Sequence, residues 1–374
     1  MAASLALAAG FHQRGAYRYL SVFQEVWSLT VANYVEPVDQ ARLLDGAYRG
    51  MLASLDSASG YLSPGDEQRI AAPPGKARAG LQVLQSGGIP VVVRVDPGSP
   101  AEAAGLSRGD QIWRIDGRPT RTLPWSLLTR LLSGDEGQTL ELEILDGSTF
   151  KLQEVSLALS ASTAPPAVEL ERLDGGVIHL RLHDLDRVDP VRDGGLLART
   201  LEAHPGAPLL VDLRGVVAVD PALVQRFGGW LLPAGASLKL VGRSGADQRI
   251  VAGAAPVVDL PEALFVLTDS STAGVGEALA ALLVETRRAR SCGRKTYGLA
   301  GVPELIRLQA GGSVLLTTQE MRTPGGTAWS GEGIEPERVL PLPVGEDEAG
   351  ADPLLDAARR WILSGVEAET AEAA

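Results

Sequence analysis

The sequence contains a single cysteine, Cys292, among its 374 residues. One thiol excludes an internal disulfide and a cysteine-rich metal site, although it does not fix the cellular compartment. Histidine is almost as scarce, and the four residues are His12, His179, His183 and His204. The segment around His179 and His183 alternates like a strand, so the two rings do not share a helical metal-binding face. We therefore expect neither a metal nor a cofactor.

Long apolar runs and an excess of positive charge are also missing. No stretch reaches the roughly 20 apolar residues that a membrane-spanning helix needs. The chain has 34 lysines and arginines against 46 aspartates and glutamates, a net charge of −12. A phosphate backbone or an anionic membrane surface would be repelled by such a chain, so we expect no nucleic-acid partner.

The first residues, "MAASLALAAG", are apolar but lack the basic flank of a signal peptide. Ala6-Leu7-Ala8 resembles the small-x-small end of a cleavage site. Residues 1–16 are therefore open to several interpretations: the remnant of an export signal or anchor, a disordered segment, or the frayed start of an alanine-rich helix.

Three regions with different patterns of apolar residues follow. Apolar residues recur at helical spacing from Tyr17 to Leu55, with Pro37 between two runs, and predict a helical region over 17–70. After the Pro/Gly-rich segment "AAPPGKARAG", short alternating strands over 76–150 predict a small, partly open β-barrel. A helix is expected within this barrel from Trp125 to Leu132.

Beyond a second linker, "LSASTAPPAVE", strands and helices alternate over 165–343. This alternation predicts an α/β core with a mainly parallel sheet, including "DPALVQRFGGWLL" as a helix and "LKLVGRS", "PELIRLQ" and "SVLLTTQEMRT" as strands. Residues 344–364 read as a final amphipathic helix, and the Ala/Glu-rich residues 365–374 as a disordered tail. The predicted fold class is therefore multidomain α/β.

Three separated segments carry a family resemblance: "SLDSASGYLSP", "VDPGSPAEAAGLSRGDQIWRIDG" and "RTPGGTAWSGEGIEPE". With "VDLRG" and "DSSTAGVGEA" lying between the last two, the chain from Tyr17 to Leu363 resembles the carboxyl-terminal processing peptidases. These are S41 serine peptidases that carry a PDZ domain. The resemblance implies hydrolysis near the C-terminus of protein substrates by a serine nucleophile, a neutral lysine base and backbone donors for the oxyanion.

The reactive positions of that family are occupied by other residues here. The nucleophile position, three residues before Glu277, is Gly274, and the lysine of the family's "T-[FY]-G-K-G" is Leu299. The glutamine that orients the lysine is replaced by Pro303. Where the family has "DLRGNPGG", residues 212–219 read "DLRGVVAV", so β-carbons replace glycines of the oxyanion loop. We therefore expect no catalytic residues and a peptidase-like protein without peptidase activity.

Two active alternatives remain open from the sequence. One is a relocated nucleophile, Ser271 or Thr272, although Ser270 and these two hydroxyls are expected to end the strand or cap the helix. Lys295 lies four residues before Leu299 along an apparent strand and is expected to point elsewhere.

The other active alternative is a Ser-His-Asp arrangement. Asp212 would have to meet His179 or His183 beside a serine, and such a triad is recognised by geometry that the sequence does not show.

The PDZ-like region is the part that the resemblance leaves intact. Backbone N–H groups of Gly80, Leu81, Gln82 and Val83 would hold a terminal carboxylate, and Leu128 would lie on the opposite helical wall. The expected partners are protein C-termini or peptides, and further an active peptidase relative or a second copy of the chain. A purely structural assembly protein is a third interpretation. The habit of the family suggests the bacterial cell envelope or periplasm.

Overall fold

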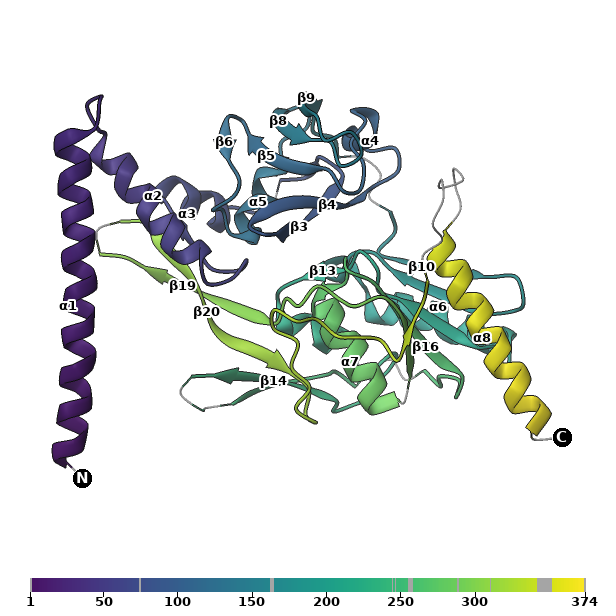
Figure 1. The fold of residues 1–374 in the computed structure, drawn as a ribbon. Helices are drawn as coiled ribbons and strands as arrows, with labels where there is room; N and C mark the ends of the chain where they lie inside the picture. The colour runs from purple at the N-terminus through teal and green to yellow at the C-terminus, as the bar shows by residue number, and fades with distance from the viewer. Residues whose placement is uncertain are drawn as a thin grey trace. The chain divides into compact units, whose positions relative to one another are not determined.

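The computed structural model describes most of the chain, which Figure 1 shows as a ribbon. The described residues are 2–73, 75–161, 165–243, 245, 247–254, 258–287, 289–309, 311–341 and 352–372. Contacts divide the chain into two compact units, Met1–Met51 and Leu52–Ala374. The predictions made for residues 162–164, 344–351 and 373–374 fall outside the described part.

The first unit is helical. Helix α1 covers Ala2–Asn33 and helix α2 covers Gln40–Ala53, with Pro37 in the segment between them. The backbone of residues 2–16 is thus helical and not disordered, because alanine and leucine have the strongest helix propensities. Within the described residues, no helix combines the length and the apolar character required to cross a bilayer.

The second unit begins with a short strand and helix that lead into a small β domain, which we define as residues 77–160. Strand β1 covers Gly60–Leu62, and helix α3 covers Pro64–Ala71. The elements of the small β domain are β2 (Ala77–Arg78), β3 (Leu81–Ser86), β4 (Ile89–Val95), α4 (Pro100–Ala103), β5 (Gln111–Ile115), β6 (Arg118–Pro119), α5 (Trp125–Leu131), β7 (Ser133–Gly134), β8 (Thr139–Leu145) and β9 (Leu152–Ala158).

The small β domain is antiparallel throughout. Its main sheet has the order β3-β4-β5-β8-β9, β6 pairs with β5, and β2 pairs with β7. Alternate strand residues such as Val92, Ile112 and Leu142 are buried in its core, where α5 adds Leu127 and Leu128. The prediction of a small β domain that contains a helix starting at Trp125 is confirmed.

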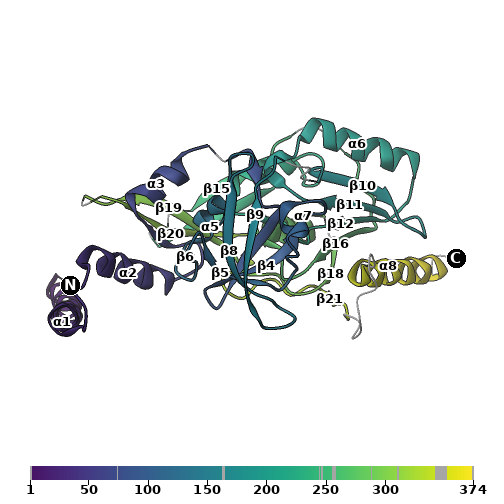
Figure 2. The ribbon, with the colours of Figure 1, turned by 90° about the horizontal axis from the view of Figure 1, so that it is seen from above.

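The α/β core, residues 165–341, is built on a six-stranded sheet. Its strands are β10 (Val168–Arg172), β11 (Ile178–Leu182), β12 (Leu209–Asp212), β16 (Leu264–Thr268), β18 (Arg290–Gly293) and β21 (Arg338–Val339). They are hydrogen-bonded in this order, and Figure 2 shows their labels running in it. Only the pair β10 and β11 is antiparallel, so the expected mainly parallel sheet is confirmed.

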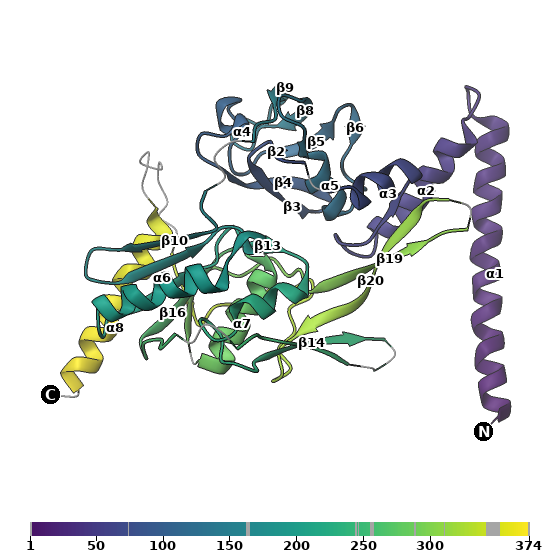
Figure 3. The same cartoon turned by 180° about the vertical axis from the view of Figure 1, so that it is seen from behind.

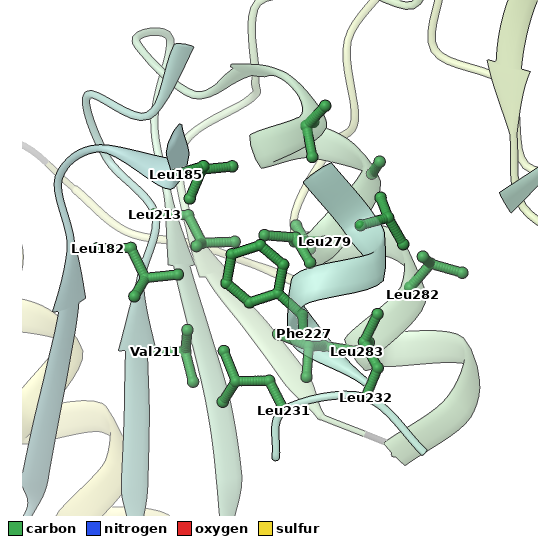
Figure 4. Close-up of a cluster of buried hydrophobic side chains, with 14 of the residues drawn as sticks. Leu182, Leu185, Val211, Leu213, Phe227, Leu231, Leu232, Leu279, Leu282 and Leu283 are labelled. Atoms are coloured by element: carbon green, nitrogen blue, oxygen red, sulfur yellow. The ribbon is translucent and has the colours of Figure 1, made fainter. Parts of the chain in front are cut away.

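Helices cover both faces of this sheet. The elements are η1 (Leu185–Arg187), α6 (Pro190–Ala203), η2 (Pro221–Phe227), α7 (Val275–Arg287) and α8 (Pro353–Glu372). Alternate residues of one strand serve opposite faces: Val211 packs with α6 and α7, whereas its neighbour Leu210 packs with α8. Figure 3 shows α6 and α7 on the near side of the sheet, and Figure 4 shows Phe227 surrounded by leucines from several of these elements.

A second sheet in this unit was not predicted as a separate layer. Strands β14 (Ser237–Gly242), β15 (Gln248–Val251), β19 (Gly301–Arg307) and β20 (Ser313–Arg322) pair antiparallel with one another and with β1. Placing "LKLVGRS", "PELIRLQ" and "SVLLTTQEMRT" in the parallel sheet was therefore wrong. Periodicity identifies a strand but not its neighbours, which hairpins such as β19–β20 decide.

Two helix predictions also need correction. The segment "DPALVQRFGGWLL" contains only the 3₁₀-helix η2, which ends at Phe227, because Gly228 and Gly229 follow directly. At the C-terminus, the backbone of α8 continues to Glu372, eight residues beyond the predicted end of the helix at 364. Alanine and glutamate favour helix over coil once α8 has been nucleated.

A buried charge network fixes the start of α8 to the sheet. Arg214, which follows β12, donates from Nη2 to Asp212 (2.6 Å) and makes a two-pronged ion pair with Asp352 (2.7 and 2.8 Å). Asp352 also accepts a hydrogen bond from the backbone N–H of Leu355 in the first turn of α8 (3.0 Å). Charge-assisted hydrogen bonds from an arginine to a carboxylate are among the stronger hydrogen bonds in proteins. This network therefore holds the start of α8 to the C-terminal end of β12.

His179 extends the network on β11. Its Nε2 lies 3.2 Å from Asp212 Oδ2, and its Nδ1 lies 2.9 Å from Glu171 Oε1. Burial alone would lower the pKa of His179, but the hydrogen bonds and charges of Asp212 and Glu171 outweigh it and raise that pKa above its usual value. Burial likewise opposes ionisation of Asp212, but Arg214 and His179 hold its pKa below the usual range.

A raised histidine pKa makes stability depend on pH. The contribution is fully present below the unfolded pKa of about 6.5 and is lost as pH rises through the higher folded pKa. As the pH rises from about 6 to about 9, the free energy of unfolding should decrease less in His179→Gln than in the wild type, as measured by urea denaturation. His204→Gln, at the end of α6, is the control and should lose as much as the wild type. An unchanged pH dependence in His179→Gln would contradict this assignment.

Candidate functional site

The site predicted from the sequence lies between the end of β16 and the start of α7. The two-residue strand β17 (Ala273–Gly274) occupies this turn. Gly274 adopts a positive φ of 65°, and a Cβ added there would lie 1.8 Å from the carbonyl oxygen of Ala218. A serine at this position would require the backbone at Ala218 to move.

The segment in the position of the family's oxyanion loop closes against this turn. Strand β13 (Val217–Ala218) pairs in parallel with β17, so that Val217 faces Ala273 and Ala218 faces Gly274. The N–H of Ala273 also donates to the carbonyl of Val216 (2.8 Å). Backbone groups of the segment are therefore used within the protein, and Ala218 and Val219 place β-carbons at the two positions expected to be glycines.

Leu299, the residue predicted to replace the lysine, is 4% exposed. It packs in an apolar cluster with Ala58, Leu84 and Ala273, which we call the Leu299 cluster. Leu84 belongs to β3 of the small β domain, so side chains of that domain and of the α/β core meet at the position of the expected base. A leucine cannot accept a proton, and Leu299 also borders a cavity of about 540 Å³ that Tyr297 and Thr317 line as well.

The other residues expected near a base are displaced from this cluster. Lys295 is exposed to solvent. Pro303 lies in β19, at a shift in register between β19 and β20, and lines a separate surface cavity beside Gln319. Neither residue supplies the missing proton acceptor at Leu299.

The buried carboxylate of Glu277, from which the nucleophile position was counted, lies at the centre of this site. Glu277 is fully buried and accepts four hydrogen bonds: from the N–H groups of Gly274 (2.9 Å), Gly298 (2.7 Å) and Leu299 (2.7 Å), and from Thr296 Oγ1 (2.5 Å). Burial raises the pKa of Glu277 to about 7, against the opposing effect of these hydrogen bonds. Glu277 thereby ties the nucleophile turn to the loop that carries Leu299.

The three hydroxyl groups of the turn have structural partners or lie at the surface. Ser271 is 2% exposed; its Oγ contacts a carboxylate oxygen of Asp269 closely and accepts a hydrogen bond from the N–H of Gly215 (2.8 Å). Thr272 Oγ1 donates to the carbonyl of Leu213 (3.0 Å). Ser270 is exposed. The hydroxyls thus hold the turn together, as expected for groups at a strand end.

The candidate triad does not assemble. His179 does contact Asp212, but the second ring nitrogen of His179 faces Glu171 and not a serine. His183 Nε2 lies 2.9 Å from Glu169 Oε2, and burial lowers the pKa of His183. Among the residues that the structure describes, no group of three or more His, Cys, Asp or Glu side chains is arranged to hold a metal ion.

Polar contacts join the small β domain to the loops around this site. Tyr297, between Thr296 and Leu299, donates from its hydroxyl to the carbonyl of Gln85 on β3 (2.6 Å). Arg108 Nη2 lies 3.0 Å from Asp269 Oδ2 in the nucleophile turn. Arg94 Nη1, on β4, donates to the carbonyl of Gly215 (3.3 Å). Each of the three loops at the site therefore contacts the small β domain.

The predicted peptide-binding residues do not all line one groove. Leu81, Gln82 and Val83 line a cavity of about 320 Å³ between β3, α5 and residues 216–220 of the core. Gly80 has a φ of +76°, and it lines a smaller neighbouring cavity together with Leu81 and Gln82. Leu128 is completely buried, so the prediction that it forms the groove wall is wrong. The α5 residues that line the groove are Trp125, Thr129 and Arg130.

Three residues of the site were not identified from the sequence: Glu277, Tyr297 and Arg94. The sequence could have indicated Glu277, because a carboxylate in the first turn of the very apolar helix α7 needs a polar partner. Tyr297 and Arg94 gave no signal, because their partners are backbone carbonyls more than 100 residues away in the sequence.

The buried carboxylate of Glu277 yields a stability prediction. Glutamine at this position would keep one acceptor oxygen and turn its NH₂ group toward backbone N–H donors. We expect Glu277→Gln to lower the free energy of unfolding by about 2–4 kcal/mol, as measured by urea denaturation. Glu202→Gln, on the exposed side of α6, is the matched control and should change it by less than about 0.5 kcal/mol. Equal stability of the two variants would show that Glu277 does not have this role.

Comparisons with known proteins agree with this geometry. Residues 229–340 match the family model of peptidase family S41, and residues 91–146, within the small β domain, match a PDZ domain. A photosystem II D1 C-terminal processing protease has the same fold, with a TM-score of 0.64 at 22% identity over 90% of this chain and 95% of that chain.

Relatives at the sequence level have consistent names. A carboxyl-terminal-processing protease of Synechocystis sp. is 29% identical over 72% of this chain and 64% of its own length. The carboxy-terminal-processing protease of Bartonella bacilliformis is 25% identical over 91% of this chain and 79% of its own. Chloroplastic carboxyl-terminal-processing peptidase 2 of Arabidopsis thaliana is 27% identical over 84% of this chain and 63% of its own length. The match thus spans less than two thirds of the length of two of these relatives. The chain is similar to the carboxyl-terminal processing proteases, with one region that matches peptidase family S41 and another that matches a PDZ domain.

Proposed function

We propose that this chain binds the C-termini of proteins or peptides through its PDZ domain and does not hydrolyse them. The observation that carries the proposal is the packing of the expected dyad. Gly274 leaves no room for a nucleophilic side chain, and Leu299 is buried among apolar residues where a base is required. Loss of a nucleophile that acts as a unit with its base lowers the rate by about a million-fold.

One contact favours a second candidate function, an active serine peptidase with Ser271 as a relocated nucleophile. Ser271 Oγ lies against the carboxylate of Asp269, which is a potential proton acceptor. Three features count against it: Ser271 is 2% exposed, its Oγ also accepts the N–H of Gly215, and the other oxygen of Asp269 faces Arg108. A substrate carbonyl has no access to this hydroxyl in the packed structure. Thr272, which is completely buried, has the same disadvantage.

The proposal extends to partners and compartment. A binding protein without peptidase activity would act on an active peptidase relative or on a second copy of itself, and would do so in the bacterial cell envelope. The resemblance to the carboxyl-terminal processing peptidases is the support for both statements.

Chemical labelling separates the inactive protein from the relocated nucleophile. We expect a fluorophosphonate probe, which modifies activated serines, to leave the folded wild-type chain unlabelled, because its buried hydroxyls are engaged in hydrogen bonds. In-gel fluorescence and intact mass measure the outcome. Labelling of the wild type that disappears in Ser271→Ala would overturn the inactive assignment and establish the second candidate.

Peptide binding is tested at Gly80, in the loop before β3. A Cβ added to Gly80 would lie 2.1 Å from the Cβ of Ser99, so Gly80→Ala distorts the loop expected to hold a terminal carboxylate. We expect this variant to bind a labelled C-terminal peptide at least about ten-fold more weakly by fluorescence anisotropy.

Gly87→Ala is the matched control for this substitution. Gly87 also has a positive φ, 58°, but a Cβ there meets nothing within 4 Å, so peptide binding should be retained. In the wild type, amidation of the peptide's terminal carboxylate should weaken binding as much as Gly80→Ala does. Equal binding of the free and amidated peptides would contradict recognition of C-termini.

A further inference from the structure

The groove beside β3 has a second wall that comes from the peptidase-like core. On the PDZ side it is lined by residues of β3 and α5, and on the core side by Leu185, Leu223 and residues 216–220. Val217 and Val219 are both partly exposed and lie close to the Leu299 cluster. The segment that has lost its glycines therefore borders the groove, in addition to closing the nucleophile turn.

Trp125 limits how far a ligand can extend along β3. Its Nε1 donates to the carbonyl of Val83 (2.8 Å), which is then unavailable to a ligand strand. Strand β3 is at the end of its sheet, so its first residues, Leu81 and Gln82, remain the place for strand addition. The groove thus suits only the last few residues of a peptide, and the upstream residues must pass its rim.

The rim of the groove carries charges of both signs. Asp184, Asp186 and Asp220 line it together with Arg78 and Arg130. Arg78 Nη1 lies 3.7 Å from Asp184 Oδ2, whereas Asp186 and Asp220 are exposed and form no ion pair among the described residues. Burial and the neighbouring charges of Asp184 and Asp220 raise the pKa of Asp186, although Arg226 and Arg78 oppose the rise. Within the described residues, the Asp186 carboxylate accepts no hydrogen bond, so its charge is free to meet a ligand.

A buried histidine marks the same groove. His183 lines it and is 6% exposed, and its Nδ1 has no hydrogen-bond partner among the described residues. Buried polar atoms are nearly always satisfied by protein, water or ligand, so this atom is suited to a polar group of a bound chain.

Building on the proposed binding of C-termini, we propose that the groove selects C-terminal segments with lysine or arginine just upstream of small apolar end residues. The terminal residues lie between β3 and the segment 216–219, and the upstream cation meets the exposed carboxylates of Asp186 and Asp220. The valines of the former oxyanion loop thus become part of a binding wall. The two exposed aspartates, Asp186 and Asp220, are the reason for expecting a basic residue in the ligand.

Two labelled peptides of about ten residues test this selectivity by fluorescence anisotropy. Both end in three alanines with a free carboxylate; one carries three lysines immediately upstream and the other three glutamates. We expect the wild type to bind the lysine peptide about five-fold to ten-fold more tightly, a preference that shrinks in about 0.5 M salt.

Variants assign the preference to particular residues. Asp186→Asn should reduce the preference for the lysine peptide about two-fold to three-fold. Asp174→Asn, an exposed aspartate that does not line the groove, makes the same change in charge and should leave the preference unchanged. Val219→Thr keeps the shape of the side chain but adds a hydroxyl, so it should weaken the binding of both peptides. Its control is Val251→Thr, on the exposed part of β15, which should weaken the binding of neither.

The outcomes distinguish this inference from the proposed function on which it rests. Equal affinity for the two peptides, or equal effects of Asp186→Asn and Asp174→Asn, would overturn the basic selectivity and leave recognition of C-termini standing. If neither peptide binds, both the basic selectivity and the recognition of C-termini are overturned. If Val219→Thr binds the peptides as tightly as the wild type, the core segment is not part of the binding groove.

Discussion

The buried carboxylate of Glu277 holds together the part of the structure on which everything else depends. It accepts the N–H of Gly274 in the nucleophile turn and the N–H groups of Gly298 and Leu299 in the facing loop. Thr296, which donates to the same carboxylate, also accepts the N–H of Ile334 (2.7 Å). One side chain, with Thr296, therefore joins three separate segments of the chain.

This scaffold persists although the groups that would use it are absent. Gly274 is closed off by Ala218, Leu299 is packed with Leu84, and the hydroxyl of Tyr297 anchors the same loop to β3. Apolar side chains surround Leu299, and backbone pairing joins Ala218 to Gly274. The physical result is an interface between the PDZ domain and the core, bordered by a groove on the side of β3.

The sequence was sufficient for the fold class, because it depends on local pattern; the assignment of residues to the reactive positions stays a prediction from motif spacing. It could not show that Val217 pairs with Ala273, since a two-residue parallel bridge has no periodicity. It placed Leu128 in the groove and missed Trp125, because both belong to one short helix and only its rotation decides which side chain faces β3. The antiparallel sheet around β20 was missed for a related reason: strand neighbours are set by tertiary packing.

The central claim is that this chain recognises a C-terminus without cleaving a peptide bond. The most direct measurement is the mass of a lysine-containing C-terminal peptide recovered after prolonged incubation with the wild-type chain at a concentration where anisotropy shows it to be bound. The account predicts recovery of the peptide at its full mass. Fragments that accumulate with the wild type but not with Ser271→Ala would contradict it.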